Sequence, residues 1–250
     1  MLQKVITLAN FKGGVGKSTS AASIGACLAM KGYKTLLVDL DGQSNLTLYY
    51  ILHAESLETS IYDALIHGET LPIFNVKPNL DIVPSSLEMA SAEIAMSNML
   101  AREQQLTRIL EPVKKQYDFV LIDCPPSLGI VTTNAFLAAD QILVPMTPEL
   151  LPLKGMRMLD SFVESLKVVK PSVCLDGVFI TRFNHRKLNK VVAEALKERY
   201  ASITCSTVIR ENIALAEAAG SGNSIFEYEP NSNGAQDYLA LTEEIVHKIV

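Results

Sequence analysis

Two lysines and a hydroxyl stand in a glycine-rich stretch near the start of the chain, FKGGVGKST at residues 11–19. Its glycines allow a sharp turn in which successive backbone N–H groups point at an anion. Lys17 is placed to reach the β- and γ-phosphates of a nucleotide, and Ser18 to coordinate Mg²⁺. The stretch predicts a phosphate-binding loop. A glycine turn that binds nothing is the alternative, which the apolar run before it and the helical pattern after it disfavour.

Three acidic residues lie where apolar runs end. Asp39 and Asp41 close LLVDLD, and Asp123 closes FVLID. Ligands of parallel sheets bind beyond the carboxyl ends of the strands, so we expect these carboxylates beside the phosphates. Asp123 is placed to bind Mg²⁺ through water, as the acid of a Walker B strand does. Acids that merely end strands are the alternative interpretation.

The elements that must position these residues alternate along the chain. Apolar runs predict strands at 4–9, 34–40, 80–85, 117–124, 141–146 and 175–182, and helical patterns occur at 17–30, 101–116, 131–139, 153–169, 188–199 and 235–249. This alternation predicts an α/β fold in which a mostly parallel, twisted sheet carries helices on both faces. No linker or repeat divides the chain, so we expect a single P-loop nucleotide-binding domain over residues 1–250.

Composition favours a globular protein, with 48% hydrophobic and 20% charged residues. No apolar run approaches the roughly 20 residues of a membrane span, and the N-terminus lacks the features of a signal peptide. The four cysteines are far apart and form no C-x-x-C pair, which disfavours disulfides and a zinc site. These features predict a soluble, cytoplasmic protein.

Charge is distributed unevenly along the chain, although the net charge is −5. Residues 182–199 hold six basic and two acidic residues, a local charge of +4, while residues 211–250 hold seven acidic residues and one lysine. Within this basic segment the helical spacing predicts a core-facing side made of Leu188, Val191, Val192, Ala195 and Leu196. The opposite, basic side either contacts DNA or is merely solvated, and the sequence leaves both open.

A family resemblance rests on three motifs. The common phosphate loop begins with glycine at the position of Phe11, and here Lys12 follows directly. KGGVGKS at 12–18 resembles the deviant Walker A motif of the ParA/MinD group of P-loop ATPases, and the D-x-D at 39–41 and D-x-P-P at 123–126 resemble its two switch loops. The likeness covers nearly the whole chain.

The resemblance implies a role for each site residue. Lys12 would cross a dimer interface to the partner's ATP, and Asp41 would orient the attacking water. The implied catalytic residues are Lys12, Lys17 and Asp41, and the implied Mg²⁺ site is Ser18, Asp39 and Asp123. The implied ATP-binding residues are Lys12, Gly13, Gly14, Val15, Gly16, Lys17, Ser18, Thr19, Thr181 and Arg182, the last two at the adenine.

Two departures from the family pattern stand out. Gly42 replaces a frequent proline, which predicts a looser first switch loop. The family's R-N-x-R-L-x-E-A run for DNA is replaced by RENIALAEA from Arg210 onward. The candidate DNA contacts are therefore Arg210 together with residues of the basic segment, namely Arg186, Lys187, Lys190 and Lys197.

The implied function is an ATP-dependent homodimer that binds DNA without sequence preference and segregates or positions a plasmid, chromosome or other cargo. A ParB-like partner would stimulate its slow ATP hydrolysis and reset it, and the ATP-bound form would lie on the nucleoid. Because the lysine motif begins at residue 12, we expect the small form without the N-terminal helix-turn-helix domain of larger relatives.

Three other functions compete with this one. A MinD-like membrane switch needs a basic C-terminal helix, whereas the polar side of 235–249 is acidic, so we expect no stable membrane association. Metabolic P-loop enzymes such as dethiobiotin synthetase lack the early lysine. Nitrogenase iron protein needs cluster cysteines, which this chain does not place suitably.

Overall fold

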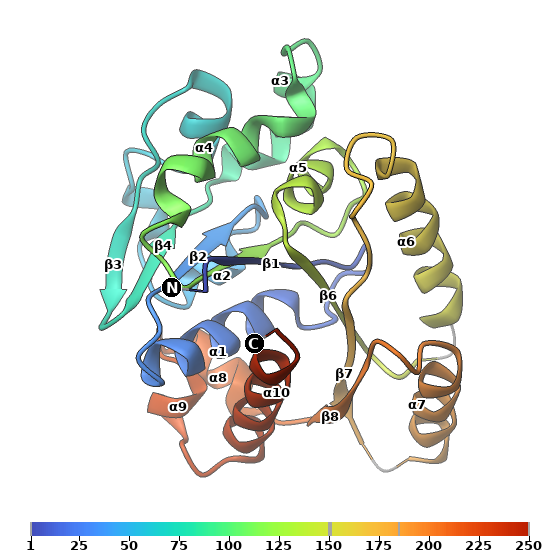
Figure 1. Ribbon diagram of the computed structural model, residues 1–250. Helices are drawn as coiled ribbons and strands as arrows, with labels where there is room; N and C mark the ends of the chain where they lie inside the picture. Colours follow the sequence, from blue (N-terminus) through green and yellow to red (C-terminus); the bar gives the residue numbers. More distant parts are fainter. Residues whose placement is uncertain (1, 150–151, 185, 250) are drawn as a thin grey trace.

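The computed structural model describes residues 2–149, 152–184 and 186–249, and a sheet of eight strands runs through them (Figure 1). The strand order is β3-β4-β2-β5-β1-β6-β7-β8, and every neighbouring pair is parallel except β3 with β4. The strands are β1 Lys4–Leu8, β2 Thr35–Asp39, β3 Phe74–Lys77, β4 Leu80–Val83, β5 Phe119–Asp123, β6 Gln141–Met146, β7 Gly177–Phe183 and β8 Thr204–Arg210.

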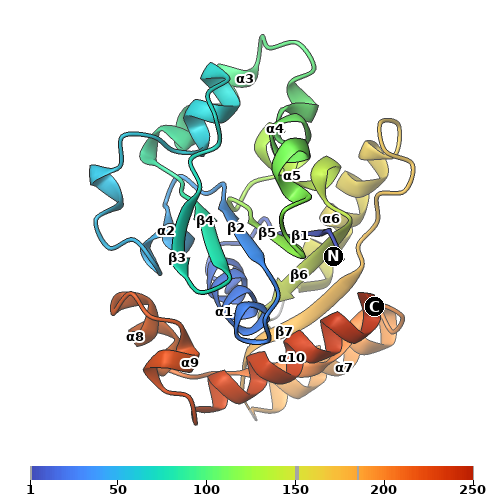
Figure 2. The same ribbon diagram turned by 60° about the vertical axis from the view of Figure 1, so that its left-hand side comes forward.

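Helices cover both faces of this sheet, as predicted. Helices α1 and α10 pack on one face, and α4, α5, α6 and α7 pack on the other. Figures 1 and 2 show α8 and α9 gathered near α1 and α10. The helices are α1 Lys17–Met30, α2 Asn45–Leu48, α3 Ala92–Met96, α4 Gln105–Lys114, α5 Ile130–Ala138, α6 Pro152–Leu166, α7 Lys187–Arg199, α8 Ala214–Gly220, α9 Ile225–Tyr228 and α10 Asn233–Ile249, with short 3-10 or π turns at Ala54–Ser56, Asp63–His67, Leu87–Ser91 and Arg102–Gln104.

Both faces of the central strands are buried because their side chains alternate between two cores. On β5, Val120 and Ile122 belong to the core under α4 and α5, while Leu121 belongs to the core under α1 and α10. A strand covered on both sides must be apolar at every position, which explains the continuous apolar runs of the sequence.

Helix α1 begins and ends where the sequence predicts. It starts at Lys17, directly after the glycine turn, and ends at Met30. Gly32 has a φ of +88°, a conformation that glycine adopts without a steric penalty, and the N–H of Tyr33 donates to the carbonyl of Leu28 at 3.1 Å. This closing turn lets β2 start three residues later.

The two edge strands were not predicted. β3 and β4 form an antiparallel hairpin whose turn contains Pro78 and Asn79, the latter with a φ of +60°. The Pro-Asn pair is a turn signal that could have indicated this hairpin. β8 lies at the other edge, and only its pairing with β7 makes its mixed sequence TCSTVIR a strand.

Helix α7 corrects one expectation about the basic segment. Val191 was predicted to face the core but is 53% exposed, while Asn189 and Ala193 are buried in its place and Leu196 is buried as predicted. The side chain of Leu188 lies outside the described set. The helix is therefore rotated relative to the prediction, because Asn189 finds a polar partner inside the fold, Asn184 at 2.5 Å.

Helix α10 packs as a core helix. Tyr238, Leu241 and Ile245 are buried against α1, and the Tyr238 hydroxyl lies 2.9 Å from the hydroxyl of Ser20. Among the helices in the described ranges, none combines the length and apolar character needed to cross a bilayer.

Candidate active site

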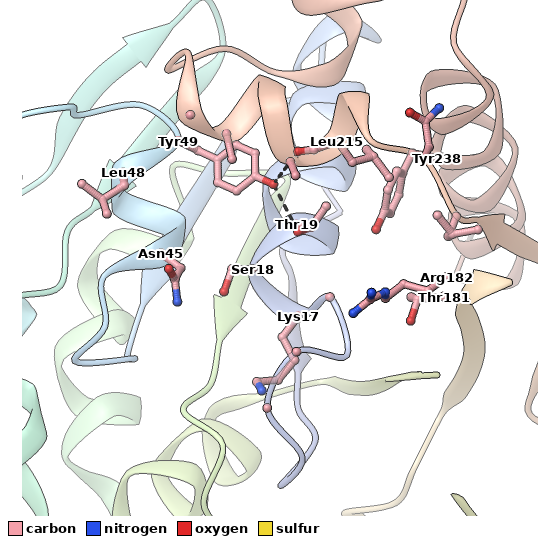
Figure 3. Close-up of a pocket in the computed structure, with 18 of the residues that line it drawn as sticks. Lys17, Ser18, Thr19, Asn45, Leu48, Tyr49, Thr181, Arg182, Leu215 and Tyr238 are labelled. Atoms are coloured by element: carbon pink, nitrogen blue, oxygen red, sulfur yellow. Dashed lines mark hydrogen bonds between the residues drawn. The ribbon is translucent and has the colours of Figure 1, made fainter. Parts of the chain in front are cut away.

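A pocket of about 950 Å³ opens at the carboxyl ends of the parallel strands. Its floor is the loop before α1, and its walls are α2, the end of β7 and the segment from the end of β8 into α8. Figure 3 shows Lys17, Ser18 and Thr19 in the middle, with Asn45, Leu48 and Tyr49 on one side and the side chains of Arg182 and Tyr238 on the other. Strand order thus gathers segments that are far apart in the chain around one cavity.

The glycine loop has the geometry of an anion cradle. Gly14 and Gly16 have φ angles of +72° and +88°, where a side chain would be strained, and α1 starts immediately afterwards with its N–H groups directed toward the loop. The ammonium group of Lys17 donates to the carbonyl of Lys12 at 3.3 Å, so it lies over the loop. A positive helix end and a lysine are thus placed to act on one anion bound in the loop.

Two carboxylates meet below this loop because β2 and β5 are neighbours in register, with Asp39 opposite Asp123. Both are fully buried. Asp39 accepts hydrogen bonds from the N–H of Asp41 at 3.0 Å and from the N–H and hydroxyl of Thr47, both at 2.8 Å. Burial nevertheless raises the pKa of Asp39 to about 6. Asp39 therefore fastens the first switch loop to the sheet.

Asp123 differs from Asp39 because no donor among the described residues meets full hydrogen-bond geometry with either oxygen, although the Ser18 hydroxyl lies close enough to lower its pKa. Burial raises its pKa well above the usual value, and the charge of Asp39 adds to this, while Ser18 and Lys17 lower it. A buried carboxylate without donors is costly unless a cation binds it. This carboxylate and the Ser18 hydroxyl are hard oxygen ligands that suit Mg²⁺. No group of three or more His, Cys, Asp or Glu side chains that could hold a metal ion occurs in the described ranges.

The first switch loop is closely packed, which corrects the expectation of a looser loop. A Cβ atom at Gly42 would lie 2.8 Å from the backbone nitrogen of Ala90, so only glycine fits this approach. The carboxylate of Asp41 lines the pocket and accepts a hydrogen bond from the N–H of Gln43 at 3.0 Å. Asp41 is thereby aimed at the cavity.

Lys12 lies apart from the pocket lining. Its ammonium group forms an ion pair with Glu149 of the same chain, and Glu149 also accepts from the hydroxyl of Thr147 at 3.0 Å. The hydrogen bonds from Lys12 and Thr147 lower the pKa of Glu149. Both partners of the pair are exposed, with side chains 45% and 61% accessible, so water screens their attraction.

The expected adenine residues occupy different positions. The Thr181 hydroxyl donates to the carbonyl of Val15 at 2.7 Å, so Thr181 supports the phosphate loop from below. Val15 itself is buried and does not line the pocket. Arg182 does line it, and Figure 3 shows its side chain reaching toward the loop from the end of β7. Arg182 has a φ of +52°, an uncommon conformation for a residue with a side chain.

The candidate DNA residues fall into two groups. Arg186, Lys187, Lys190 and Lys197 are exposed on α7 or directly before it. Arg210, in contrast, is engaged by Asp237 of α10, with its Nη2 donating to Oδ1 at 2.7 Å and its Nε to Oδ2 at 3.0 Å. The structure therefore does not support Arg210 as a free contact, because its guanidinium group joins β8 to α10.

Sequence reasoning missed the apolar wall of the pocket. Leu48, Tyr49 and Leu215 face the cavity, and the Tyr49 hydroxyl donates to the hydroxyl of Thr19 at 3.1 Å. These residues lie in or directly after two short helices, α2 and α8, that carry no distinctive motif. Only their placement across the pocket distinguishes them from ordinary core residues.

Comparisons with known proteins agree with this site. The AAA domain family matches residues 3–173. The sporulation initiation inhibitor protein Soj of Bacillus subtilis is 38% identical, with 97% of this chain and 98% of the relative covered. The cell division protein PomZ of Myxococcus xanthus is 37% identical, with 96% and 77% covered.

Solved structures show the same fold around a nucleotide. A putative plasmid partition protein of Borrelia burgdorferi bound to AMPPNP is 30% identical, with a TM-score of 0.85 and 98% and 99% of the two chains covered. Cobyrinic acid a,c-diamide synthase of Mycobacterium smegmatis with ADP and magnesium is 27% identical, with a TM-score of 0.85 and 98% and 94% covered. With its phosphate loop, switch loops and full-length relatives, this chain is a P-loop ATPase that belongs to the ParA/Soj family of partition ATPases.

Proposed function

We propose that the chain binds ATP with Mg²⁺ in this pocket and works as a dimeric switch that positions DNA or another cargo. The observation that carries the proposal is the buried, unpartnered carboxylate of Asp123 beside Ser18, directly below the glycine loop and Lys17. A buried carboxylate in that position is costly to ionise unless a cation binds it, and the phosphates of ATP would bring that cation. The relatives solved with AMPPNP and with ADP and magnesium support this assignment.

Each group of the pocket has a role in this proposal. The amides of residues 13–16 and the Lys17 ammonium bind the phosphates, and Ser18 and Asp123 hold the metal. Mg²⁺ neutralises charge on the phosphate oxygens when it is bound. Asp39 positions the switch loop rather than the metal, since the chain's own donors occupy its oxygens. Asp41 orients the attacking water, so Asp41→Ala should bind ATP and dimerise but lose hydrolysis.

Lys12 completes the site of a second copy. The lysine stands at the mouth of the loop, outside its own pocket, which leaves its ammonium group available to a partner chain once it leaves Glu149. A cation supplied in trans stabilises the charge of the phosphoryl group in transfer, as an arginine finger does. Dimerisation then depends on ATP, and a ParB-like partner protein accelerates hydrolysis to reset the switch.

Non-specific DNA is the proposed ligand of α7. Arg186, Lys187 and Lys190 are exposed together at its start, and a dimer presents two such clusters. Binding through phosphates is strongly salt-dependent and reads no sequence. Twice the number of contacts therefore turns weak binding by a monomer into strong binding by the ATP-bound dimer, which would place that form on the nucleoid.

Charge reversal tests the DNA interface. Lys187→Glu with Lys190→Glu should weaken the affinity for unrelated duplexes equally and flatten the dependence on salt, while ATP-dependent dimerisation stays intact. The matched control is Lys34→Glu with Lys115→Glu, which changes the charge equally near the amino ends of β2 and β5. If both double substitutions weakened DNA binding equally, the loss would come from the change in net charge and not from contacts made by α7. An absence of DNA binding by the wild-type protein with ATP and Mg²⁺ at low salt would refute DNA as the ligand.

A further inference from the structure

A chain of polar contacts runs from the nucleotide pocket to the buried side of α7. Glu211 lines the pocket, and one of its carboxylate oxygens lies 4.0 Å from the guanidinium of Arg182. Its other oxygen accepts from the side-chain amide of Asn184 at 3.2 Å. The side-chain oxygen of Asn184, Oδ1, accepts in turn from the side-chain amide of Asn189 at 2.5 Å and from the backbone N–H of Arg186 at 3.3 Å.

The two ends of this chain differ in their exposure. The side chains of Arg182 and Glu211 are 62% and 54% accessible, so water screens their interaction. Asn189 is only 9% exposed, so its bond to Asn184 is sheltered. Asn184 is therefore fixed firmly to α7 and more weakly to the pocket.

The strands also constrain the pocket end. The N–H of Glu211 donates to the carbonyl of Phe183 at 2.9 Å, which ties the end of β8 to the end of β7. Arg182 has its left-handed backbone conformation immediately before this tie. A displacement of Arg182 or Glu211 therefore shifts Asn184, the residue that is hydrogen-bonded to the start of α7.

We propose that Asn184 is a positioning residue that couples occupancy of the pocket to the basic start of α7. A nucleotide that covers Arg182 and Glu211 excludes water from them and strengthens the contacts between Arg182, Glu211 and Asn184. Asn184 then holds Arg186 and the first turn of α7 in one position. Ordering these side chains before DNA binds removes part of the entropy cost of binding. The DNA part of this inference rests on the proposed function, whereas the coupling to nucleotide does not.

Asn184→Ala tests the coupling in the full-length protein. With ATP and Mg²⁺, wild-type α7 amides should exchange hydrogen more slowly than without nucleotide, and the variant should lose this protection while amides of the phosphate loop keep theirs. DNA affinity should fall about fivefold. The slope of log affinity against log salt should stay unchanged, because every basic contact remains. That unchanged slope distinguishes a positioning residue from a DNA contact.

Asn75→Ala is the matched control. Asn75 is an exposed asparagine whose amide donates to Asp81 at 2.7 Å, on β3 at the opposite edge of the sheet. Its loss should change neither α7 exchange nor DNA affinity.

A rescue pair tests the individual bond. Asn184→Asp keeps an acceptor for Arg186 but cannot donate to Glu211, so ATP-dependent protection of α7 should disappear. Adding Glu211→Gln supplies a donor from the other side and restores the net charge, so the protection should return.

The outcomes are separable. If Asn184→Ala keeps both wild-type protection of α7 and wild-type DNA affinity, or if the double substitution does not restore protection, the coupling is refuted. If the wild-type protein shows ATP-dependent protection of α7 but binds no DNA, the proposed function fails and the coupling stands.

Discussion

At the scale of single residues, the two lysines of the loop have different surroundings. Lys17 is 6% exposed and lies over the glycine turn, whereas Lys12 is exposed and pairs with Glu149. An exposed ion pair contributes about 1 kcal/mol or less, so ATP on a partner chain can compete for Lys12. The exposed, weakly held position of Lys12 is thus compatible with its proposed role at the ATP of a partner chain.

Lys12→Ala should keep ATP binding, because Lys17 and the loop amides remain, but should lose the ATP-dependent dimer and partner-stimulated turnover. Sedimentation velocity with and without ATP measures the dimer, and nucleotide titration measures binding. Lys34→Ala, at an exposed lysine before β2, serves as the control. A Lys12→Ala variant that dimerises as well as wild type would show that Lys12 does not act in trans.

Asp123→Asn should stabilise the free chain at pH 7 by about 1 kcal/mol or more, because it removes a buried carboxylate without donors. The folded pKa of Asp123 is raised, so the contribution of this group is most favourable at low pH and is lost as pH rises through that pKa. The gain in the variant should therefore vanish in acid. Urea unfolding from pH 4 to 8 measures it, and a destabilised variant at pH 7 would contradict the unpartnered carboxylate.

The same Asp123→Asn variant should lose the extra stability that Mg²⁺ gives the ATP-bound wild type. Chelation of Mg²⁺ should then lower the unfolding midpoint of the wild-type complex and leave that of the variant complex unchanged. Equal responses of the two proteins would place the metal elsewhere.

At the scale of elements, α10 holds the edge strand β8 in place. Glu244 of α10 accepts from the N–H groups of Ser206 and Thr207 at 2.8 and 2.9 Å and from the Ser206 hydroxyl at 2.9 Å. Burial alone would raise the pKa of Glu244, but the hydrogen bonds from the Thr207 and Ser206 N–H groups outweigh it and lower the pKa to about 2. One side chain thus replaces the missing neighbour strand over two residues.

Glu244→Gln should cost about 2 kcal/mol of unfolding free energy at pH 7, because it removes charge-assisted hydrogen bonds. The folded pKa lies below that of an unfolded glutamate, so this stability is present above about pH 4.5 and is lost as pH falls toward 2. The difference between variant and wild type should shrink over that range in denaturant titrations. Glu243→Gln, at a neighbour that is 58% exposed and paired with Lys31, should cost far less.

At the scale of the whole molecule, the packing of α10 bears on whether the protein could attach to a membrane. The apolar side of α10 is buried against α1, so it is not available to a bilayer. Burial of this side argues against α10 as an amphipathic membrane anchor.

Sedimentation with anionic vesicles tests for membrane attachment. With ATP and Mg²⁺ the protein should stay in the supernatant with vesicles and should bind duplex DNA under the same buffer conditions. Vesicle binding that persists after Lys187→Glu with Lys190→Glu would point to an apolar membrane contact and favour the MinD-like alternative.

The sequence alone determined those features that depend on residues close together in the chain. Gly14, Gly16 and Gly32 adopt backbone angles that favour glycine, so the loop and both ends of α1 follow from residue types a few positions apart. The central strands are equally predictable, because burial on both faces demands continuous apolar runs. The α/β class, the turn before α1 and the positions of Asp39 and Asp123 at the strand ends were therefore predicted correctly.

Only the tertiary structure decided which polar groups meet. Asp39 and Asp123 have the same local appearance, an acid after an apolar run, yet one receives three hydrogen bonds and the other none. Arg210 resembles a DNA contact in sequence, but Asp237, 27 positions later, engages it. Edge strand β8 and the rotation of α7 depend likewise on distant partners. Such pairings are set by the packing of the whole sheet, and no periodicity or spacing along the chain encodes them.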